Sequence, residues 1–299
     1  MAIKYLAGER IIGTAAERTA LSTGTDTMGT GANGTAISDP TFVASGDTNG
    51  VAMPSGLGLK SYYFDGNDAI NIDGAIGFSA SSNTVGSISF WYYNTHDQEG
   101  KVILAFGDAN ASTYMKFPTR YNTTDKILGH NSDTSGNNWE IRNHANDAGD
   151  DLADDTWHHM CCVQDGTAVK LYINSILLTV WNDQTDKSEW IKSGIDSARI
   201  GCDMDTNSTN GNFLTGNVTE VALWNVALTS AQATSLYNSG NGAKASTIPS
   251  GLRAYYDGSS LNNAAVTVYP NLSNGTIFEE SDTGKHQMFD GTSAWNEMS

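Results

Sequence analysis

Residues 157–180, with the sequence WHHMCCVQDGTAVKLYINSILLTV, decide the fold. The stretch opens with a run of large and apolar side chains that ends at an Asp-Gly turn. After the turn, Val169, Leu171 and Ile173 alternate with other residues, and this period of two is typical of a strand that buries one face. The pair Asn174-Ser175 then precedes another apolar run. The stretch therefore predicts strands joined by hairpin turns.

Similar runs lie on both sides of this stretch. They are rich in β-branched and aromatic residues and cover residues 61–64, 70–73, 85–93, 101–106, 198–201 and 216–224. The chain has 31 Gly and only 5 Pro, a composition that suits tight turns between strands. Strands of this number and spacing predict an all-β sandwich or jelly roll. One helix is expected at residues 231–237, with Thr229 or Ser230 as its N-cap and Gly240 after its end.

Composition divides the chain into three zones. Residues 1–57 are rich in Gly, Thr, Ser and Ala, which predicts an extended N-terminal arm that is ordered only where it lies against something. Residues 58–242 carry the strands of the jelly roll. Residues 243–299 contain further short strands joined by Asp-Thr-Gly and Asp-Gly turns. We expect them to form a small β-rich C-terminal segment for docking or assembly.

The charge of the chain excludes two classes of partner. Its 299 residues include 16 Lys and Arg against 33 Asp and Glu, which gives a net charge of −17. Binding to nucleic acid needs clustered positive charge, and an anionic membrane surface repels an acidic chain. The acid excess does permit cation binding. Because no window approaches 18 consecutive apolar residues, we expect no membrane-spanning helix and no membrane insertion.

The N-terminus and the cysteines predict the compartment in which the chain folds. Residues 1–10 carry charges where the apolar core of a secretion signal would stand, so we expect synthesis and folding in a cytoplasm. Cys161 and Cys162 are neighbours in a strand and point to opposite faces, which places them poorly for pairing with each other. Together with Cys202 they are expected to be buried small hydrophobes.

Six short motifs follow one another through the middle of the chain: FDG (64–66), ISFW (88–91), DTWHH (155–159), VKLYIN (169–174), IG (200–201) and FLTGNVTEVALWNVALT (213–229). Their order resembles that of laminin-G-like, or pentraxin-like, domains, which are concanavalin-A-like jelly rolls. The resemblance covers roughly residues 58–242. It implies that Trp157 stands at a strand start and covers the edge of the sandwich. We assign Trp91, Trp157 and Trp224 to the core. One departure is Asn174-Ser175, where the family commonly has Asp-Gly.

The two ends of the chain resemble a different group. Residues 3–13, IKYLAGERIIG, and residues 276–285, TIFEESDTGK, followed by a late Ser-Ala-Trp, are similar to segments of virion structural proteins of marine phages and archaeal viruses. Virions assemble in the host cytoplasm, so this resemblance agrees with the missing secretion signal. It implies localisation in a virion.

Enzymatic motifs are absent from the sequence. Retaining glucanases of this fold carry a Glu-x-Asp-x-x-Glu motif, because hydrolysis needs two carboxylates about 5 Å apart. The acids of residues 279–282 lie outside the jelly roll and are interpreted as a solvated turn. His158 and His159 are adjacent in a strand and face opposite ways, so they cannot act on one site together. We expect a protein that is not an enzyme.

Calcium is the chemical hypothesis that the pentraxin-like resemblance implies. Ca²⁺ takes six to eight oxygen ligands, which loops at one rim of a sandwich can supply. Matching the family's ligand positions onto this chain assigns Asp97, Gln98, Asp203 and Asp205, with an added oxygen from Asn210 or Asn212. The alternative is that these are solvated acidic loops in an acidic protein. A second acidic cluster, residues 147–155, has more charge but no matching partner loop.

Sugar binding would use exposed aromatic rings beside Asn and Asp side chains. Trp181 and Trp190 flank the polar residues 182–187 and are the least core-like tryptophans. Tyr114 and Tyr121 are further candidates. Core or strand-edge packing is the alternative role for each of these rings.

These observations favour a non-enzymatic virion structural protein of the capsid surface, fibre or tail. Its jelly roll would contact a glycan or a host surface, while its ends dock it through self-association and contacts with other virion proteins. One alternative is a cellular carbohydrate-binding or adhesion module, which would need an export route. The other is a purely architectural protein without a ligand.

Overall fold

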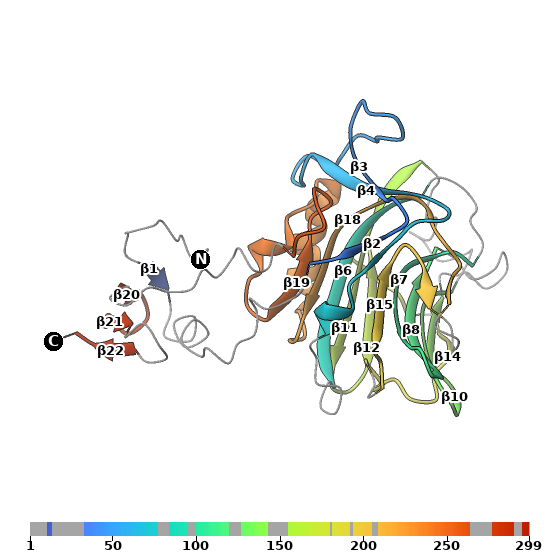
Figure 1. Ribbon diagram of the computed structural model, residues 1–299. Coiled ribbons are helices and arrows are strands. Elements are labelled where there is room, and N and C mark those ends of the chain that lie inside the picture. Colours follow the sequence, from blue (N-terminus) through green and yellow to red (C-terminus); the bar gives the residue numbers. More distant parts are fainter. Residues whose placement is uncertain are drawn as a thin grey trace.

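The computed structural model describes residues 11–13, 33–76, 84–94, 100–119, 127–142, 155–179, 181–191, 194–204, 209–263, 277–289 and 295–298. Within them, two antiparallel sheets pack face to face as a sandwich, and a small sheet lies apart from it (Figure 1). The predicted all-β jelly-roll sandwich is thereby confirmed. None of the helices in the described residues is long and apolar enough to cross a membrane.

The first sheet, here called the β7 sheet, has eight strands. Their order is β14 (Trp181–Asp183), β10 (Gly136–Arg142), β9 (Ile127–Asp133), β8 (Ala111–Pro118), β7 (Val102–Asp108), β15 (Ser197–Ile200), β5 (Ala69–Asn71) and β2 (Thr35–Ile37). The short helix η2 (Asp73–Ile76) follows β5. A two-stranded hairpin, β16 (Asp203–Met204) and β17 (Asn210–Gly211), lies against β7 and β15.

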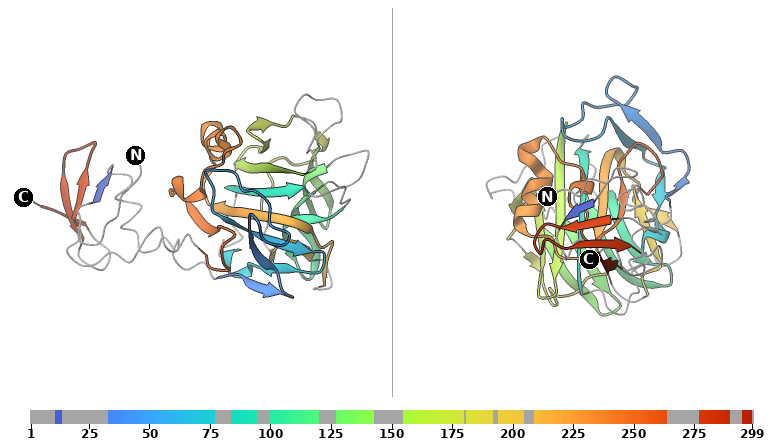
Figure 2. Two further views of the ribbon diagram at one scale, coloured as in Figure 1. Left: turned by 90° about the horizontal axis from the view of Figure 1, so that it is seen from above. Right: turned by 90° about the vertical axis from the view of Figure 1, so that its left-hand side faces the viewer.

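The second sheet, the β6 sheet, faces the first across the sandwich (Figure 2). Its order is β13 (Ile176–Leu177), β12 (Val169–Ile173), β11 (Thr156–Asp165), β6 (Val85–Asn94), β18 (Thr215–Trp224), β4 (Lys60–Asp65) and β3 (Thr41–Ala44), with β19 (Leu252–Tyr256) also paired to β18. β2 and β3 precede residue 58, and β19 follows residue 242. The sandwich therefore extends beyond both expected zone boundaries, because strands from either side complete its sheets.

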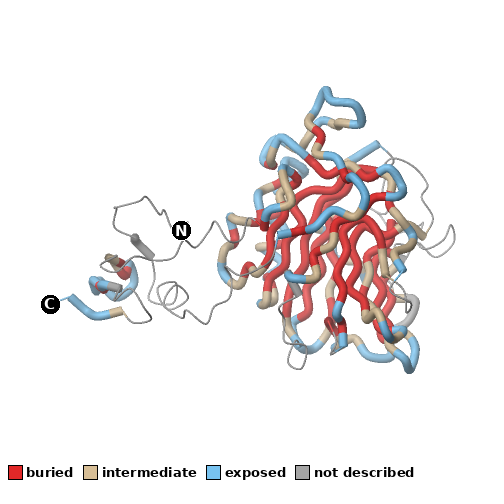
Figure 3. The backbone as a smooth tube through the Cα atoms, viewed as in Figure 1, coloured by how far each residue is buried: buried red, intermediate tan, exposed pale blue. Residues whose placement is uncertain are grey.

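The central strands of the β6 sheet are buried on both faces (Figure 3). In β11, Met160 and Cys162 point into the main core between the two sheets. Cys161 and Val163 point the other way, into a second apolar cluster beneath the helix α2 (Ser230–Tyr237) and the short helix η4 (Ala245–Thr247). A strand buried on both faces needs apolar residues at successive positions, which is the pattern of MCCV.

A β-bulge in β18 keeps this two-sided pattern in phase. Thr219 pairs with Trp91 and Ala222 with Ser89, so β18 has one residue more than β6 between these pairs. The extra residue is Glu220, whose φ of 54° lies in the left-handed region. Because of the bulge, Val221 and Leu223 face the main core, while Ala222 and Trp224 face the second cluster.

The hairpin turn between β12 and β13 explains why Asn174-Ser175 can stand where related domains commonly have Asp-Gly. Asn174 and Ser175 have φ values of 49° and 67°, as a tight two-residue hairpin turn requires. The Asn174 side chain bonds back to β11: its Oδ1 accepts from the backbone N of His159 at 2.9 Å, and its Nδ2 lies 3.2 Å from Nδ1 of His158. A carboxylate could accept the first hydrogen bond but could not donate the second.

The helix begins and ends close to the predicted positions. The side chain of Thr229 caps the backbone of Gln232, and Gln232 bonds back to Thr229, which forms a capping box. Asn238 ends α2 in the left-handed conformation, and the short helix η3 (Asn238–Gly240) follows. Thr229 is therefore the N-cap, the first of the two predicted candidates.

The described ends of the chain meet in a small sheet of four strands. β1 (Ile11–Gly13) pairs in parallel with β20 (Ile277–Glu280), which continues antiparallel to β21 (His286–Phe289) and β22 (Trp295–Glu297). Phe278 is buried on one face, whereas Met288 on the other face is 40% exposed. Figure 2 shows this sheet away from the sandwich, so the ends pair with each other rather than with the jelly roll.

Cysteine and histidine side chains take structural places in the sandwich. All three cysteines are free and buried, as predicted, and burial raises the pKa of the Cys161 thiol to about 12. His158 and His159 face opposite ways, which also agrees with the prediction. His159 bonds to Oγ of Ser89 at 2.8 Å, and burial lowers its pKa to about 3, so the ring stays neutral. Trp91 and Trp224 are buried, as expected. Trp157 is half-buried at the start of β11, where its indole N–H donates to the carbonyl of Ala52, so its assignment to the core was wrong.

Glu220 is a buried carboxylate whose protonation is coupled to folding. Its Oε1 and Oε2 accept from the Tyr255 hydroxyl at 2.8 and 2.7 Å, and its Oε2 also accepts from the backbone N of Ala245 at 3.0 Å. Burial raises its pKa from 4.5 to about 7, against the opposite effect of these hydrogen bonds. The folded chain therefore holds this proton more tightly than the unfolded chain does.

We predict that Glu220→Gln flattens part of the pH dependence of the free energy of unfolding. In the unmodified protein this group stabilises the fold at low pH, and its contribution is lost as the pH rises from about 4.5 to about 7. The shift corresponds to about 3 kcal/mol over that window. Gln resembles the protonated acid at every pH. In urea unfolding, the difference in the free energy of unfolding between variant and unmodified protein should shift in favour of the variant when the pH is raised from 5 to 8. If the free energies of the two proteins change in parallel with pH, the raised pKa does not belong to Glu220.

Candidate functional site on the β7 sheet

A row of polar side chains crosses the outward face of the β7 sheet. Residues that pair across neighbouring strands point to the same face of a sheet. Glu140 of β10 pairs with His130 of β9, and His130 pairs with Lys116 of β8. The neighbours of these residues along each strand belong to the core, as Met115 and Phe117 do on either side of Lys116. Because successive side chains in a strand point to opposite faces, Glu140, His130 and Lys116 point away from the core. The row continues through Ala105 of β7 to Arg199 of β15.

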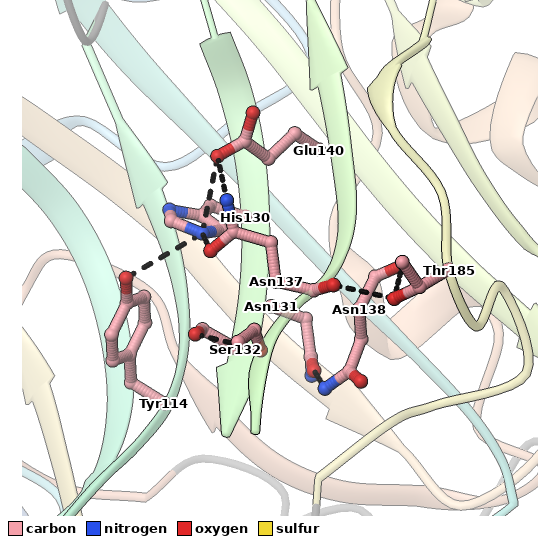
Figure 4. A network of polar contacts seen from close by, with 9 residues as sticks. Tyr114, His130, Asn131, Ser132, Asn137, Asn138, Glu140 and Thr185 are labelled. Atoms are coloured by element: carbon pink, nitrogen blue, oxygen red, sulfur yellow. Dashed lines mark hydrogen bonds and ion pairs between the residues drawn. The ribbon is translucent and has the colours of Figure 1, made fainter. Parts of the chain in front are cut away.

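Four of the outward side chains form a hydrogen-bonded network (Figure 4). His130 Nε2 lies 3.0 Å from Asn137 Oδ1, 3.3 Å from Glu140 Oε1 and 3.5 Å from the Tyr114 hydroxyl. The Asn137 amide also donates to Glu140 Oε1 at 2.9 Å. His130 and Glu140 are buried, whereas Tyr114 and Asn137 are half-buried. The Tyr114 hydroxyl and the Asn137 amide therefore reach solvent, while the buried His130 and Glu140 hold them in place.

Tyr114 is held from two sides. The His130 ring meets it edge-on, with centroids 5.0 Å apart and planes at 87°. The Lys116 ammonium lies 4.6 Å from the centroid of the Tyr114 ring, a cation–π contact. Because Lys116 covers one face of its ring, Tyr114 offers a hydroxyl group at this site rather than an open ring face for stacking.

The β16–β17 hairpin limits the site at β7. Asp203 of β16 forms an ion pair with Lys116, with Oδ2 3.4 Å from Nζ, and accepts from the Asn212 amide at 3.1 and 3.0 Å. On the far side of the hairpin, Arg199 donates to Asn210 Oδ1 at 3.2 Å and is ion-paired with Asp73. The open polar face is therefore confined to β8, β9 and β10.

Behind the network, buried amides attach residues 185–190 to both sheets. Asn131 donates to the carbonyl of Trp190 at 2.9 Å, and Asn138 donates to Asn131 at 3.0 Å. Gln164 of β11 donates to the carbonyls of Lys187 and Glu189 at 3.0 and 3.2 Å. These bonds satisfy polar groups that would otherwise be costly to bury. They hold β9 and β10, and with them His130 and Glu140, in one position.

The predicted glycan residues separate in the structure. Trp190 is 4% exposed and is part of the main core, so it offers no ring face to a sugar, which corrects that expectation. Trp181 packs against the core from β14, and the Lys187 ammonium lies 4.4 Å from the centre of its ring. Tyr114 lies in the polar network. Tyr121 lies outside the described residues.

The predicted calcium ligands are only partly placed. Asp203 lies on β16 with Lys116 and Asn212 as its partners. Asp97, Gln98 and Asp205 lie outside the described residues, as do residues 147–154 of the second acidic cluster. In the part of the chain that the structure describes, no three His, Cys, Asp or Glu side chains gather as a metal site would require.

Sequence reasoning missed His130, Asn137 and Glu140, because residues 127–133 and 136–142 were not recognised as strands. The alternation of Trp139, Glu140 and Ile141 was the available signal. The contact between Tyr114, Lys116 and His130 depends on strand register, which no local pattern shows.

The two packed sheets and the polar outward face define a β-sandwich of the lectin-like class. Residues 64–234 match the concanavalin A-like lectin/glucanases superfamily, and the chain belongs to this family. Its fold is that of carbohydrate-binding lectins. No curated protein matches the sequence.

Solved structures with a similar fold share little sequence with this chain. Domain 4 of an extracellular GH43 arabinanase from Geobacillus stearothermophilus, solved with arabinotriose, is 17% identical; the match covers 72% of this chain and 91% of that one, with a TM-score of 0.47. Tailspike protein 2 of the Escherichia coli O157:H7 bacteriophage CAB120 is 12% identical over 78% of this chain and 31% of that one (TM-score 0.49). A pentraxin from Limulus polyphemus is 15% identical over 56% and 76% (TM-score 0.39). These likenesses concern the fold alone.

Proposed function

We propose that this chain is a non-enzymatic virion structural protein whose sandwich contacts a glycan through β8, β9 and β10. The observation that carries the glycan contact is the network of Tyr114, His130, Asn137 and Glu140. It combines hydrogen-bond donors and acceptors on one outward face, and sugar hydroxyls need both. A network held by internal bonds loses little freedom when a ligand binds.

A binding role rather than catalysis agrees with the charges on this face. Glycoside hydrolysis typically needs two carboxylates close to each other. Two described carboxylates of the face, Asp203 and Asp73, instead have the cationic partners Lys116 and Arg199, and a third, Glu140, contacts the His130 ring. Such pairs fix the positions of the side chains, and fixed side chains lose less conformational entropy when a ligand binds.

The small sheet supports the docking role of the chain ends. Four strands of three or four residues cover little apolar area, so a sheet of this size has little stability of its own. Met288 and Met298 are 40% and 42% exposed on it. Burial of these side chains against a second copy or another virion protein would stabilise the sheet.

Binding to immobilised glycans tests the sugar contact. Replacing Tyr114→Phe together with Asn137→Ala removes a hydroxyl and an amide that contribute about 1 kcal/mol each, so affinity should fall about tenfold or more. The matched control is Lys170→Ala on the other sheet, which removes an exposed partner of Asp165 and should leave binding unchanged. Equal binding by the double variant would place the glycan elsewhere, and absence of all glycan binding would favour the purely architectural alternative.

Particle incorporation tests the virion role. Removal of residues 277–298 deletes three strands of the small sheet and should prevent the chain from co-purifying with assembled particles. The melting temperature of the sandwich should stay the same, because these strands pair with no sandwich strand. Incorporation of the shortened chain at the normal level would contradict docking through this sheet.

The proposed cofactor is Ca²⁺, bound by Asp97, Gln98, Asp203 and Asp205. An ion that binds only the folded state stabilises it by about 2.7 kcal/mol when it is a hundredfold above its Kd. We therefore predict a higher melting temperature in millimolar calcium than in chelator. Asp203→Ala with Asp205→Ala should abolish the difference, whereas superimposable melting curves of the unmodified protein would refute the site.

A further inference from the structure

Two cations beside the proposed glycan face are ion-paired, which bears on the class of sugar that the face accepts. Lys116 is paired with Asp203, and Arg199 is paired with Asp73. The side chains of Lys116 and Asp203 are each only 14% exposed. At these two pairs the charges are fixed and neutralise each other.

An acidic sugar would have to take one of these cations from its partner. Lys116 lies at the open face, since its ammonium also contacts the Tyr114 ring. If a sugar carboxylate bound Lys116, the shielded Asp203 carboxylate would lose its counter-charge and would stand near a second anion. Removing one partner of a partly buried pair is costly, and like charges at short range add to that cost.

The long-range field acts in the same direction. With a net charge of −17, the chain repels anionic ligands before they reach the surface. Uncharged hydroxyl-rich ligands meet no such barrier. The half-buried Tyr114 hydroxyl and Asn137 amide can exchange hydrogen bonds with them without breaking an ion pair.

Resting on the proposed glycan contact, we propose that the site takes neutral glycans, and that Asp203 is the specificity residue that excludes acidic ones. In the calcium-free protein, Asp203 acts by holding the Lys116 ammonium and cancelling its charge, so the glycan comparison is made in the presence of chelator. Asp203 differs from the network residues in its position, because it lies on the β16–β17 hairpin, whereas the network residues lie on β8, β9 and β10.

The test uses pairs of immobilised oligosaccharides that differ only by a terminal sialic or uronic acid. The unmodified protein should bind the neutral member at least tenfold more tightly than the acidic member. Asp203→Asn should reduce that preference at least fivefold, because Lys116 then has an uncancelled charge. The matched control is Asp165→Asn, which changes the net charge equally and frees Lys170 on the other sheet; it should keep the unmodified preference.

Each result decides between the claims. Equal or tighter binding of acidic glycans by the unmodified protein overturns the inference while leaving the glycan contact intact. Equal effects of Asp203→Asn and Asp165→Asn would assign the preference to net charge and overturn the role of Asp203. If neither member of any pair binds, the proposed glycan contact fails, and this inference fails with it.

Discussion

Burial of both faces of the β6 sheet is the constraint on which the rest of the structure depends. One face packs against the β7 sheet, and the other is covered by α2, η4 and the apolar residues around them. Strands β6, β11 and β18 therefore carry buried side chains at successive positions; these are apolar, or polar and hydrogen-bonded as Ser87 and Ser89 are. The Glu220 bulge is one consequence: one extra residue restores the correct alternation for Val221 to Trp224.

The same constraint leaves the β7 sheet as the one with a free polar face. Because the second apolar cluster lies behind the β6 sheet, the outward side chains of β8, β9 and β10 are not needed for packing and can be polar. Their low exposure shows that they pack closely against one another. Hydrogen bonds and ion pairs replace apolar contacts there, and the buried amides of Asn131, Asn138 and Gln164 support the face from behind.

The sandwich and the small sheet are two separate units built from one chain. The sandwich recruits β2, β3 and β19 from outside the central zone, so its boundaries follow hydrogen bonding rather than composition. The small sheet joins Ile11–Gly13 to strands near the other end of the chain. This unit is made from both ends of the chain and carries exposed methionines, and it lies apart from the sandwich (Figure 1).

The sequence by itself determined the fold class, the β11–β12–β13 hairpins, the capped helix, and the burial of the cysteines, because local periodicity and turn residues specify these features. It also identified Tyr114 and Asp203 as residues of interest, but not the contacts that they make with His130 and Lys116. Only the tertiary structure decided that Trp190 is core, that Glu220 is a bulge, and that Tyr114, Lys116, His130 and Asp203 meet on one face. The physical reason is strand register: residues far apart in the chain become neighbours through cross-strand pairing, and a shift of one residue would turn each of them to the opposite face.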